Sequence, residues 1–281
     1  MSAALDAPAT PHDAVDMTLT DLPTPVPQAA FRQQGAFLYL AQFLPAHVTA
    51  QLIAGTQAVW GKVNRNYLPG HKQGGSVSRH VIDQLAPAIA ELYRSPQLIH
   101  WLEQLCGERL LPSPVDDPHA YALYFYTEPG DHIGWHYDTS YYEGRRYTLL
   151  LGILDESSCR LEYRLHTRSA ATPVVTGAVQ IPPGGLVFFD GDQLHHRITP
   201  LRAGEQRVSL TFEYVTNPHM RPLRRFISNM KDAVAYFGFR QVFSQLRAKR
   251  QKPQGPVPRC SRCRWGWRCL LASSLGRASR R

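Results

Sequence analysis

Two histidines and one aspartate are spaced so that they could share a metal ion. His136 and Asp138 form an H-x-D triplet, and His196 follows 58 residues after the aspartate. Residues i and i+2 of a β-strand project from the same face, so the triplet aims an imidazole and a carboxylate at one point. A later histidine on a neighbouring strand can add a third ligand. Two imidazoles and one carboxylate leave three coordination positions open, the ligand set of non-haem Fe(II) sites that activate oxygen.

The third ligand has two candidates, because His195 and His196 are adjacent. Neighbouring residues of a strand point to opposite faces, so only one of them can reach the metal. Strand alternation alone does not decide between the two.

An arginine and a serine follow the last histidine and share a strand face. Arg207 and Ser209 are two residues apart. A guanidinium group binds a carboxylate through two parallel hydrogen bonds, and a serine hydroxyl adds a third donor. The pair suits the distal carboxylate of a keto-acid cosubstrate. Together with the metal ligands it indicates an oxygenase that uses iron and 2-oxoglutarate.

Short strands must position these residues. After Asp117-Pro118 the chain alternates between apolar runs and turn residues, with no helix pattern between them. Strands are expected at residues 119–127, around the H-x-D triplet, and at 147–154, 159–165, 178–181, 185–189 and 207–215. Regular short strands of this kind predict a mainly β core with flanking helices, a double-stranded β-helix (a cupin-like jelly roll).

The flanking segments divide the chain further. We expect helices at 45–60, 77–93 and 96–106, and a glycine- and lysine-rich loop at 68–77. The expected organisation is a disordered leader at 1–30, a mainly helical part of the catalytic domain at 31–117, the β core at 118–217, C-terminal helices at 218–247, and a basic, disordered tail with Cys and Trp at 248–281.

The net charge of +9 comes from the C-terminal tail. Residues 246–281 hold 11 Lys and Arg and no acid, which leaves 20 basic and 22 acidic residues, a net of −2, in the rest. The body therefore gives no charge argument for nucleic-acid binding. The first 31 residues contain no Lys or Arg, and no apolar run is long enough to span a membrane. We expect a cytoplasmic protein with no membrane span, and a homodimer remains open.

The segment from residue 119 to 216 resembles the double-stranded β-helix dioxygenases, the superfamily of the prolyl hydroxylases. The shared pattern is H-x-D, a strand that ends in H-x-I-x-P, and then R-x-S. It implies that His196, followed by Ile198 and Pro200, is the third metal ligand, and that His195 lies around the site or at the surface. Within the superfamily, residues 134–154 and 71–75 resemble the small amino-acid halogenases and their hydroxylase relatives. Those halogenases have glycine where this chain has Asp138, so the resemblance implies hydroxylation. It also implies Fe(II), 2-oxoglutarate and O2, with ascorbate as a stimulant.

The resemblance extends to other contacts. It implies that Tyr126 and Thr148 donate hydrogen bonds to the cosubstrate. Residues beside the metal ligands and in the glycine-rich segment are expected to contact a small, polar, amino-acid-like substrate: Trp135, Tyr141, Arg145 and Lys72. Two alternatives stay open, a non-catalytic jelly-roll binding protein and a dioxygenase that modifies nucleic acid or protein and uses the basic tail for targeting.

Overall fold

The strands form one large antiparallel sheet. The computed structural model describes residues 17–19, 21–114 and 117–219, all within a unit that spans Met1–Gln245. The strands are β1 (Phe37–Leu40), β2 (Asn64–Leu68), β3 (Lys72–Ser78), β4 (Leu111–Pro112), β5 (Tyr121–Tyr126), β6 (His132–His136), β7 (Arg146–Glu156), β8 (Leu161–Leu165), β9 (Val175–Val179), β10 (Leu186–Asp190), β11 (His195–Ile198) and β12 (Gln206–Val215). Their order is β1-β10-β7-β12-β5-β3-β6-β11-β8-β9, with β2 beside β3 and β4 beside β12.

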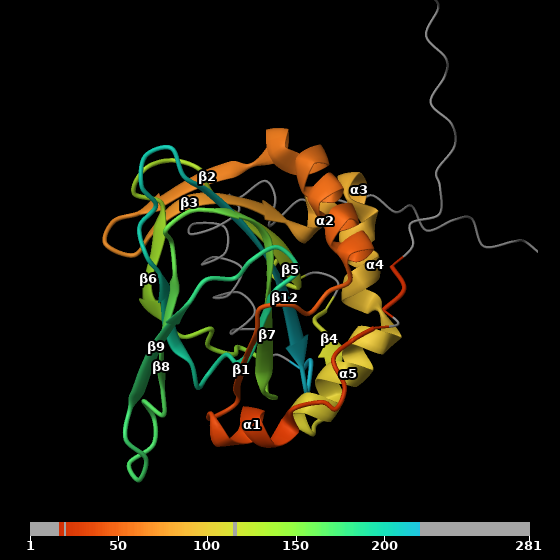
Figure 1. Ribbon diagram of the computed structural model, residues 1–281, viewed down its shortest axis with the longest axis vertical. Coiled ribbons are helices and arrows are strands. Elements are labelled where there is room, and N and C mark those ends of the chain that lie inside the picture. Colours follow the sequence, from red (N-terminus) through yellow and green to blue (C-terminus); the bar gives the residue numbers. More distant parts are fainter. Residues whose placement is uncertain (1–16, 20, 115–116, 220–281) are drawn as a thin grey trace, which may run out of the picture. The chain divides into compact units, whose positions relative to one another are not determined.

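The sheet curls into a nearly closed barrel, the predicted jelly roll (Figure 1). The helices are α1 (Gln28–Gln33), α2 (Ala46–Val59), η1 (Trp60–Lys62), α3 (Arg79–Leu85), α4 (Pro87–Arg94) and α5 (Pro96–Cys106). Helices α2 to α5 lie along one side of the barrel, away from β8 and β9 (Figure 1). The prediction of a mainly β core with flanking helices is therefore confirmed for the described residues.

The hydrophobic core has two parts. The larger part lies between the helices and the sheet and includes Leu52, Ile89, Leu102 and Phe212. The smaller part fills the inside of the barrel and includes Phe189. Strand residues alternate between these two regions because successive side chains point to opposite faces. Beyond the smaller apolar cluster, polar side chains also point into the barrel.

Two helix boundaries follow from local sequence signals. Helix α5 begins as expected after Ser95-Pro96, where the Ser95 hydroxyl accepts a hydrogen bond of 3.4 Å from the Leu98 amide. It ends at Gly107, which adopts a φ of 76° that glycine tolerates. The single helix expected at 77–93 is divided instead. Strand β3 runs to Ser78, and Pro87 starts a new helix because proline cannot continue the preceding one.

The segment at 68–77 is a strand pair and not the expected loop. Strands β2 and β3 form an antiparallel hairpin, and β3 also pairs with β5 and β6. Glycine is required for this close packing, since a Cβ at Gly75 would collide with the Val63 side chain. The part of the chain expected to be mainly helical thus contributes β1, β2 and β3 to the sheet.

The described part of the expected leader is also ordered. Leu19 is buried in the larger core, the indole of Trp101 donates to the Pro23 carbonyl at 2.8 Å, and α1 begins at Gln28. Disorder therefore does not hold for residues 17–19 and 21–30. Residues 1–16 and 20, most of the expected C-terminal helices and the whole basic tail lie outside the described residues. Within the described part of the chain, each helix is too short or too polar to cross a membrane.

Candidate active site

Two adjacent strands bring the two histidines together. His136 ends β6, and His196 lies directly opposite it on β11 in the antiparallel ladder. Asp138 lies two residues beyond the end of β6, so the H-x-D triplet does not lie entirely on a strand as expected. The turn of the chain after His136 still directs the carboxylate to the histidines. The pairing of β11 with β6 is irregular beside the site. His196 pairs with His136 but Ile198 pairs with Ile133, so the register shifts between the two pairs.

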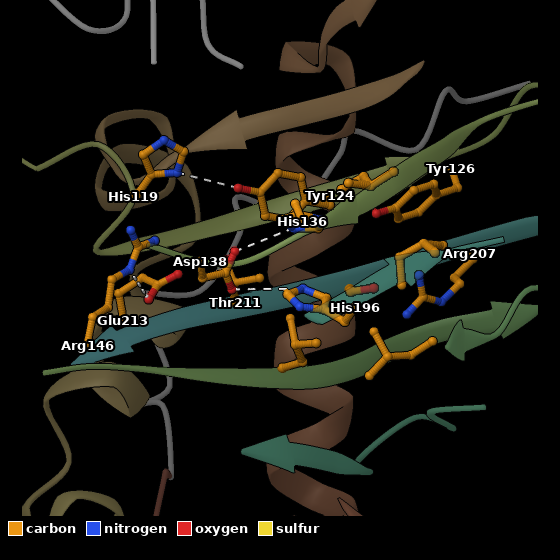
Figure 2. A pocket seen from close by; sticks show the side chains of 15 residues that line it. His119, Tyr124, Tyr126, His136, Asp138, Arg146, His196, Arg207, Thr211 and Glu213 are labelled. Carbon is orange, nitrogen blue, oxygen red and sulfur yellow. Dashed lines mark hydrogen bonds and ion pairs between the residues drawn. The ribbon is translucent and has the colours of Figure 1, made fainter. Parts of the chain in front are cut away.

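The three side chains form a cluster with the dimensions of a metal site (Figure 2). Their candidate ligand atoms all lie within 4.8 Å of one another. Nε2 of His136 is 3.5 Å from Oδ1 of Asp138, and Nε2 of His196 is 4.0 Å from Oδ2. The imidazole ring centroids are 4.2 Å apart. An ion among these atoms would have two nitrogen ligands and one oxygen ligand.

Backbone carbonyls fix both imidazole rings. Nδ1 of His136 donates to the Gly134 carbonyl at 2.8 Å, and Nδ1 of His196 donates to the Leu194 carbonyl at 3.2 Å. Because a carbonyl can only accept, each Nδ1 carries the proton and each Nε2 is free to bind a metal. His195 points the other way and stacks on Trp135 at 5.0 Å. His196 is thus the histidine that joins the cluster.

The charges of the cluster suit a cation. Burial, together with the neighbouring His136, lowers the pKa of His196 to about 4, so this ring is neutral near pH 7. Burial alone would raise the pKa of Asp138, but His136, His196 and Arg146 outweigh it and lower that pKa. Asp138 is therefore an anion. Metal ions bind neutral imidazoles and ionised carboxylates, the forms that His196 and Asp138 take here.

The expected cosubstrate residues line the same cavity as the metal cluster. Arg207, Ser209 and Tyr126 all face it and are almost fully buried. Arg207 lies 5.2 Å from the Tyr126 ring, and its Nη1 atom is buried with no hydrogen-bond partner among the described residues. A buried guanidinium nitrogen without a partner is costly unless an anion binds it. These residues therefore fit the distal carboxylate of 2-oxoglutarate.

Thr148 has a different position from the one expected. Its hydroxyl donates to Oδ2 of Asp138 at 2.9 Å and also lies 3.1 Å from Oε2 of Glu213. It is not among the residues that line the cavity in the described chain. In this position Thr148 can orient the aspartate.

The opposite end of the cavity holds an ion pair that was not singled out in the sequence. Nε of Arg146 donates to Oε2 of Glu213 at 2.7 Å (Figure 2). Burial lowers the pKa of Arg146, but Glu213 and Asp138 outweigh this and raise it, so the guanidinium stays charged. His119, Tyr124 and Thr211 line the cavity nearby. The metal cluster lies between this pair and Arg207 (Figure 2).

The four expected substrate contacts do not line the cavity in the described chain. Trp135 points outward because it neighbours a metal ligand on a strand. Lys72 is buried under Tyr124, with Nζ 4.9 Å from the ring centre. Arg145 is exposed and pairs with Glu108 at 2.9 Å. Tyr141 lies in the segment after Asp138, half-buried.

Comparison with known proteins assigns the fold. Residues 28–143 match the model of the halogenase D family. The non-haem, alpha ketoglutarate-dependent carbocyclase SnoK from nogalamycin biosynthesis has a TM-score of 0.56 at 15% identity, over 73% of this chain and 90% of its own. The epimerase SnoN, solved with Fe3+, alpha ketoglutarate and nogalamycin RO, has a TM-score of 0.54 at 13% identity, over 67% and 82%.

A prolyl hydroxylase from Trichoplax adhaerens, solved with a peptide of hypoxia inducible factor, has a TM-score of 0.52 at 14% identity. It aligns over 72% of this chain and 91% of its own. A search of curated proteins gave no match. The chain thus shares its fold with oxygenases that depend on iron and alpha ketoglutarate, and residues 28–143 match the halogenase D family model.

Proposed function

We propose that the chain is an Fe(II)- and 2-oxoglutarate-dependent oxygenase that hydroxylates an unactivated C–H bond of a small polar substrate. The observation that carries the proposal is a single cavity that holds the cluster of His136, Asp138 and His196 together with Arg207, whose buried Nη1 atom has no hydrogen-bond partner among the described residues. The cluster would hold iron, and Arg207 with Ser209 would hold the cosubstrate.

Iron and 2-oxoglutarate, when bound, would supply the oxidising chemistry. One oxygen atom of O2 enters succinate as 2-oxoglutarate loses CO2, and the other enters the substrate. The protein supplies the geometry. His136 and His196 present Nε2 because their Nδ1 protons are held by backbone carbonyls. Arg207, Ser209 and Tyr126 orient the keto acid, and the apolar side chains Leu150 and Leu161 exclude water around it.

Hydroxylation is favoured by Asp138. The amino-acid halogenases that the sequence resembles have glycine at this position, which leaves room for chloride. Here a carboxylate fills the place, held by Thr148. Proteins of similar fold catalyse other outcomes, since SnoN is an epimerase and SnoK a carbocyclase. The intact carboxylate supports oxygen transfer over halogenation.

The Arg146–Glu213 pair supports an amino-acid-like substrate. Their contact involves Nε of the guanidinium and one carboxylate oxygen, Oε2. Both residues line the cavity on the side of the metal cluster away from Arg207 (Figure 2). A zwitterion carries a carboxylate that complements Arg146 and an ammonium group that complements Glu213. A purely anionic molecule would complement only Arg146, and a neutral molecule would complement neither charge.

The test is an anaerobic titration. Addition of Fe(II) and 2-oxoglutarate should produce the weak visible charge-transfer band of the chelate near ~500 nm. The band should be lost in His196→Ala and retained in His195→Ala, since only His196 joins the cluster. Absence of the band in folded, iron-loaded wild-type protein would reject the enzyme and favour the non-catalytic binding protein. A nucleic-acid-modifying oxygenase is less favoured, because residues 1–245 carry a net charge of −2.

A further inference from the structure

The outer face of β6, β11 and β8 carries a stack of aromatic rings and guanidinium groups. His195 lies between Trp135 and Tyr137, with ring centroids 5.0 and 4.8 Å away. Arg164 lies 4.0 Å from the centre of Trp135, and Arg168 lies 4.3 Å from the centre of Tyr137. Stacking fixes the plane of a guanidinium group and leaves its N–H edges for another ligand. This stack therefore presents two oriented cations on a surface that the proposed reaction does not use.

The stack borders a groove of about 570 Å³. Trp135, Arg164 and Arg197 form one wall, and residues 176–178 of β9 form another. Of the three arginines on this face, Arg197 has an acidic partner in the described chain, Glu162, with Nε 2.7 Å from the carboxylate. The face thus carries an excess of positive charge, whereas residues 1–245 as a whole are slightly acidic. The groove suits an anionic ligand.

Strand β9 forms the edge of the described sheet beside this groove. It is last in the strand order and pairs along one side with β8. Its sequence, Val175–Val179, contains no charged residue, and the side chains of Val174 and Val175 are 54% and 50% exposed. Edge strands are usually protected by charges, proline or a covering element, because their open N–H and C=O groups accept another strand. Such an edge is a suitable site for an extended peptide.

We propose that β9 and the adjoining arginine face bind an extended acidic segment of a partner protein by strand addition. The backbone of the segment pairs with β9. Its alternate side chains then lie over the groove, on the same face as Arg164, because Thr176 of β9 is the direct neighbour of Arg164 in the ladder. Acidic residues at these positions meet the oriented guanidinium edges of Arg164 and Arg168. This interaction goes beyond the proposed oxygenase activity and requires neither metal nor 2-oxoglutarate.

Two other occupants fit the face less well. Single-stranded nucleic acid binds through bases that stack on open aromatic rings. Here Trp135 and Tyr137 are already stacked on His195 and covered by arginines, so these rings offer no free platform. A second copy of the chain, paired through β9, would place the same arginines of both copies on one face of a continuous sheet. Repulsion between like charges opposes that dimer.

The experiment uses the full chain and a short fluorescein-labelled peptide in which glutamate and valine alternate. Fluorescence anisotropy measures its affinity, and hydrogen exchange measures protection of the amides in residues 174–180. We expect binding that weakens with salt and protection that appears in β9. The same peptide with lysine in place of glutamate should not bind. Oligothymidylate is tested as a competitor.

Charge-reversal variants identify the surface. Arg164→Glu should weaken peptide binding at least about tenfold, because an attraction becomes a repulsion. Arg109→Glu makes the same change in charge at an exposed residue after α5 and should leave the affinity unchanged. If Arg164→Glu does not fold, as judged by circular dichroism, Arg168→Glu at the exposed end of the stack takes its place. The charge-transfer band of the iron chelate should persist in each variant, which separates this surface from the catalytic proposal.

Several outcomes would overturn the proposal. These are no peptide binding by the wild-type chain, equal binding in Arg164→Glu, or protection outside β9. Tighter binding of oligothymidylate that depends on Arg164 would assign the face to nucleic acid instead. A dimer in light scattering that is lost in Arg164→Glu, without peptide binding, would assign it to a second copy of the chain.

Discussion

The hydroxyl of Thr148 donates a hydrogen bond of 2.9 Å to Oδ2 of Asp138, while Oδ1 of the same carboxylate faces His136. Thr148 lies on β7, whereas the aspartate follows β6, so the contact joins two strands that are not neighbours in the sheet. It fixes the rotation of the carboxylate, with Oδ1 toward His136 and Oδ2 toward His196.

Thr148→Val should weaken metal binding by about 10- to 100-fold, the usual effect of removing a hydrogen-bond partner of a metal ligand. Anaerobic calorimetry with Fe(II) measures the affinity. Thr211→Val is a matched control, because the Thr211 hydroxyl lines the cavity but donates to the Ala122 carbonyl at 3.2 Å. Equal affinity of Thr148→Val and wild-type protein would show that the contact does not orient the ligand.

Arg207→Gln should raise the concentration of 2-oxoglutarate needed for half-saturation by about 10- to 100-fold, since a charge-assisted hydrogen bond contributes roughly 1.5–3 kcal/mol. Titration of the visible band with 2-oxoglutarate measures this change, and metal affinity should stay the same. Arg197→Gln, on the outer face, is the control. If Arg207→Gln needs the same concentration of 2-oxoglutarate as wild type, the distal carboxylate of 2-oxoglutarate does not bind Arg207.

Glu213→Gln should reduce discrimination between an amino acid and its deaminated analogue. The amide keeps a hydrogen bond to Arg146 but loses the charge that attracts an ammonium group. The effect is measured as the perturbation of the visible band by each compound in the absence of O2. Glu162→Gln changes the same charge on the outer face and should have no effect. If the substitution changes the band before any substrate is added, Glu213 affects the metal site through its hydrogen bond with Thr148 and does not contact the substrate.

Lys72→Met should stabilise the protein near neutral pH. Burial lowers the pKa of the Lys72 ammonium group well below its ordinary value. Between this lowered pKa and the unfolded value of about 10.4, the unfolded chain binds more protons, so stability rises as the pH rises. Methionine has similar volume and no proton to bind. Urea unfolding should therefore show a gain of roughly 1–3 kcal/mol at pH 7 that shrinks toward pH 10. A difference in the free energy of unfolding between Lys72→Met and wild type that does not depend on pH would contradict this account.

The candidate metal ligands could be expected from the sequence through two motifs, the H-x-D triplet and the H-x-I-x-P pattern that begins at His196. The register that places His136 opposite His196 is visible only in the structure, whereas the shared face of Arg207 and Ser209 follows from strand alternation. The same alternation, continued along β12, reaches Glu213, so that residue could also have been found. Arg146 follows the H-x-D triplet closely in the sequence, but its pairing with Glu213 could not be expected, because the pairing of β12 with β7 is not visible in one sequence.

Other expectations failed for identifiable reasons. Trp135 was expected at the substrate because it neighbours His136, yet alternation along a strand turns a neighbour of a metal ligand away from the metal. Lys72 was expected in a loop because glycines surround it. Those glycines instead allow β2, β3 and β5 to pack closely, and this packing buries the lysine.

The direct pairing of His136 with His196 also affects how the sheet holds together. In the strand order, β11 lies between β6 and β8. Strands β11, β8 and β9 are therefore joined to the other strands of the sheet by the pairing of β11 with β6. A metal ion bound by both histidines therefore cross-links β6 and β11. Ligand binding to the folded state adds its free energy to local as well as global stability. Iron loading should accordingly slow cleavage by proteases in the loop between β8 and β9, and occupancy of the β9 edge should in turn strengthen iron binding.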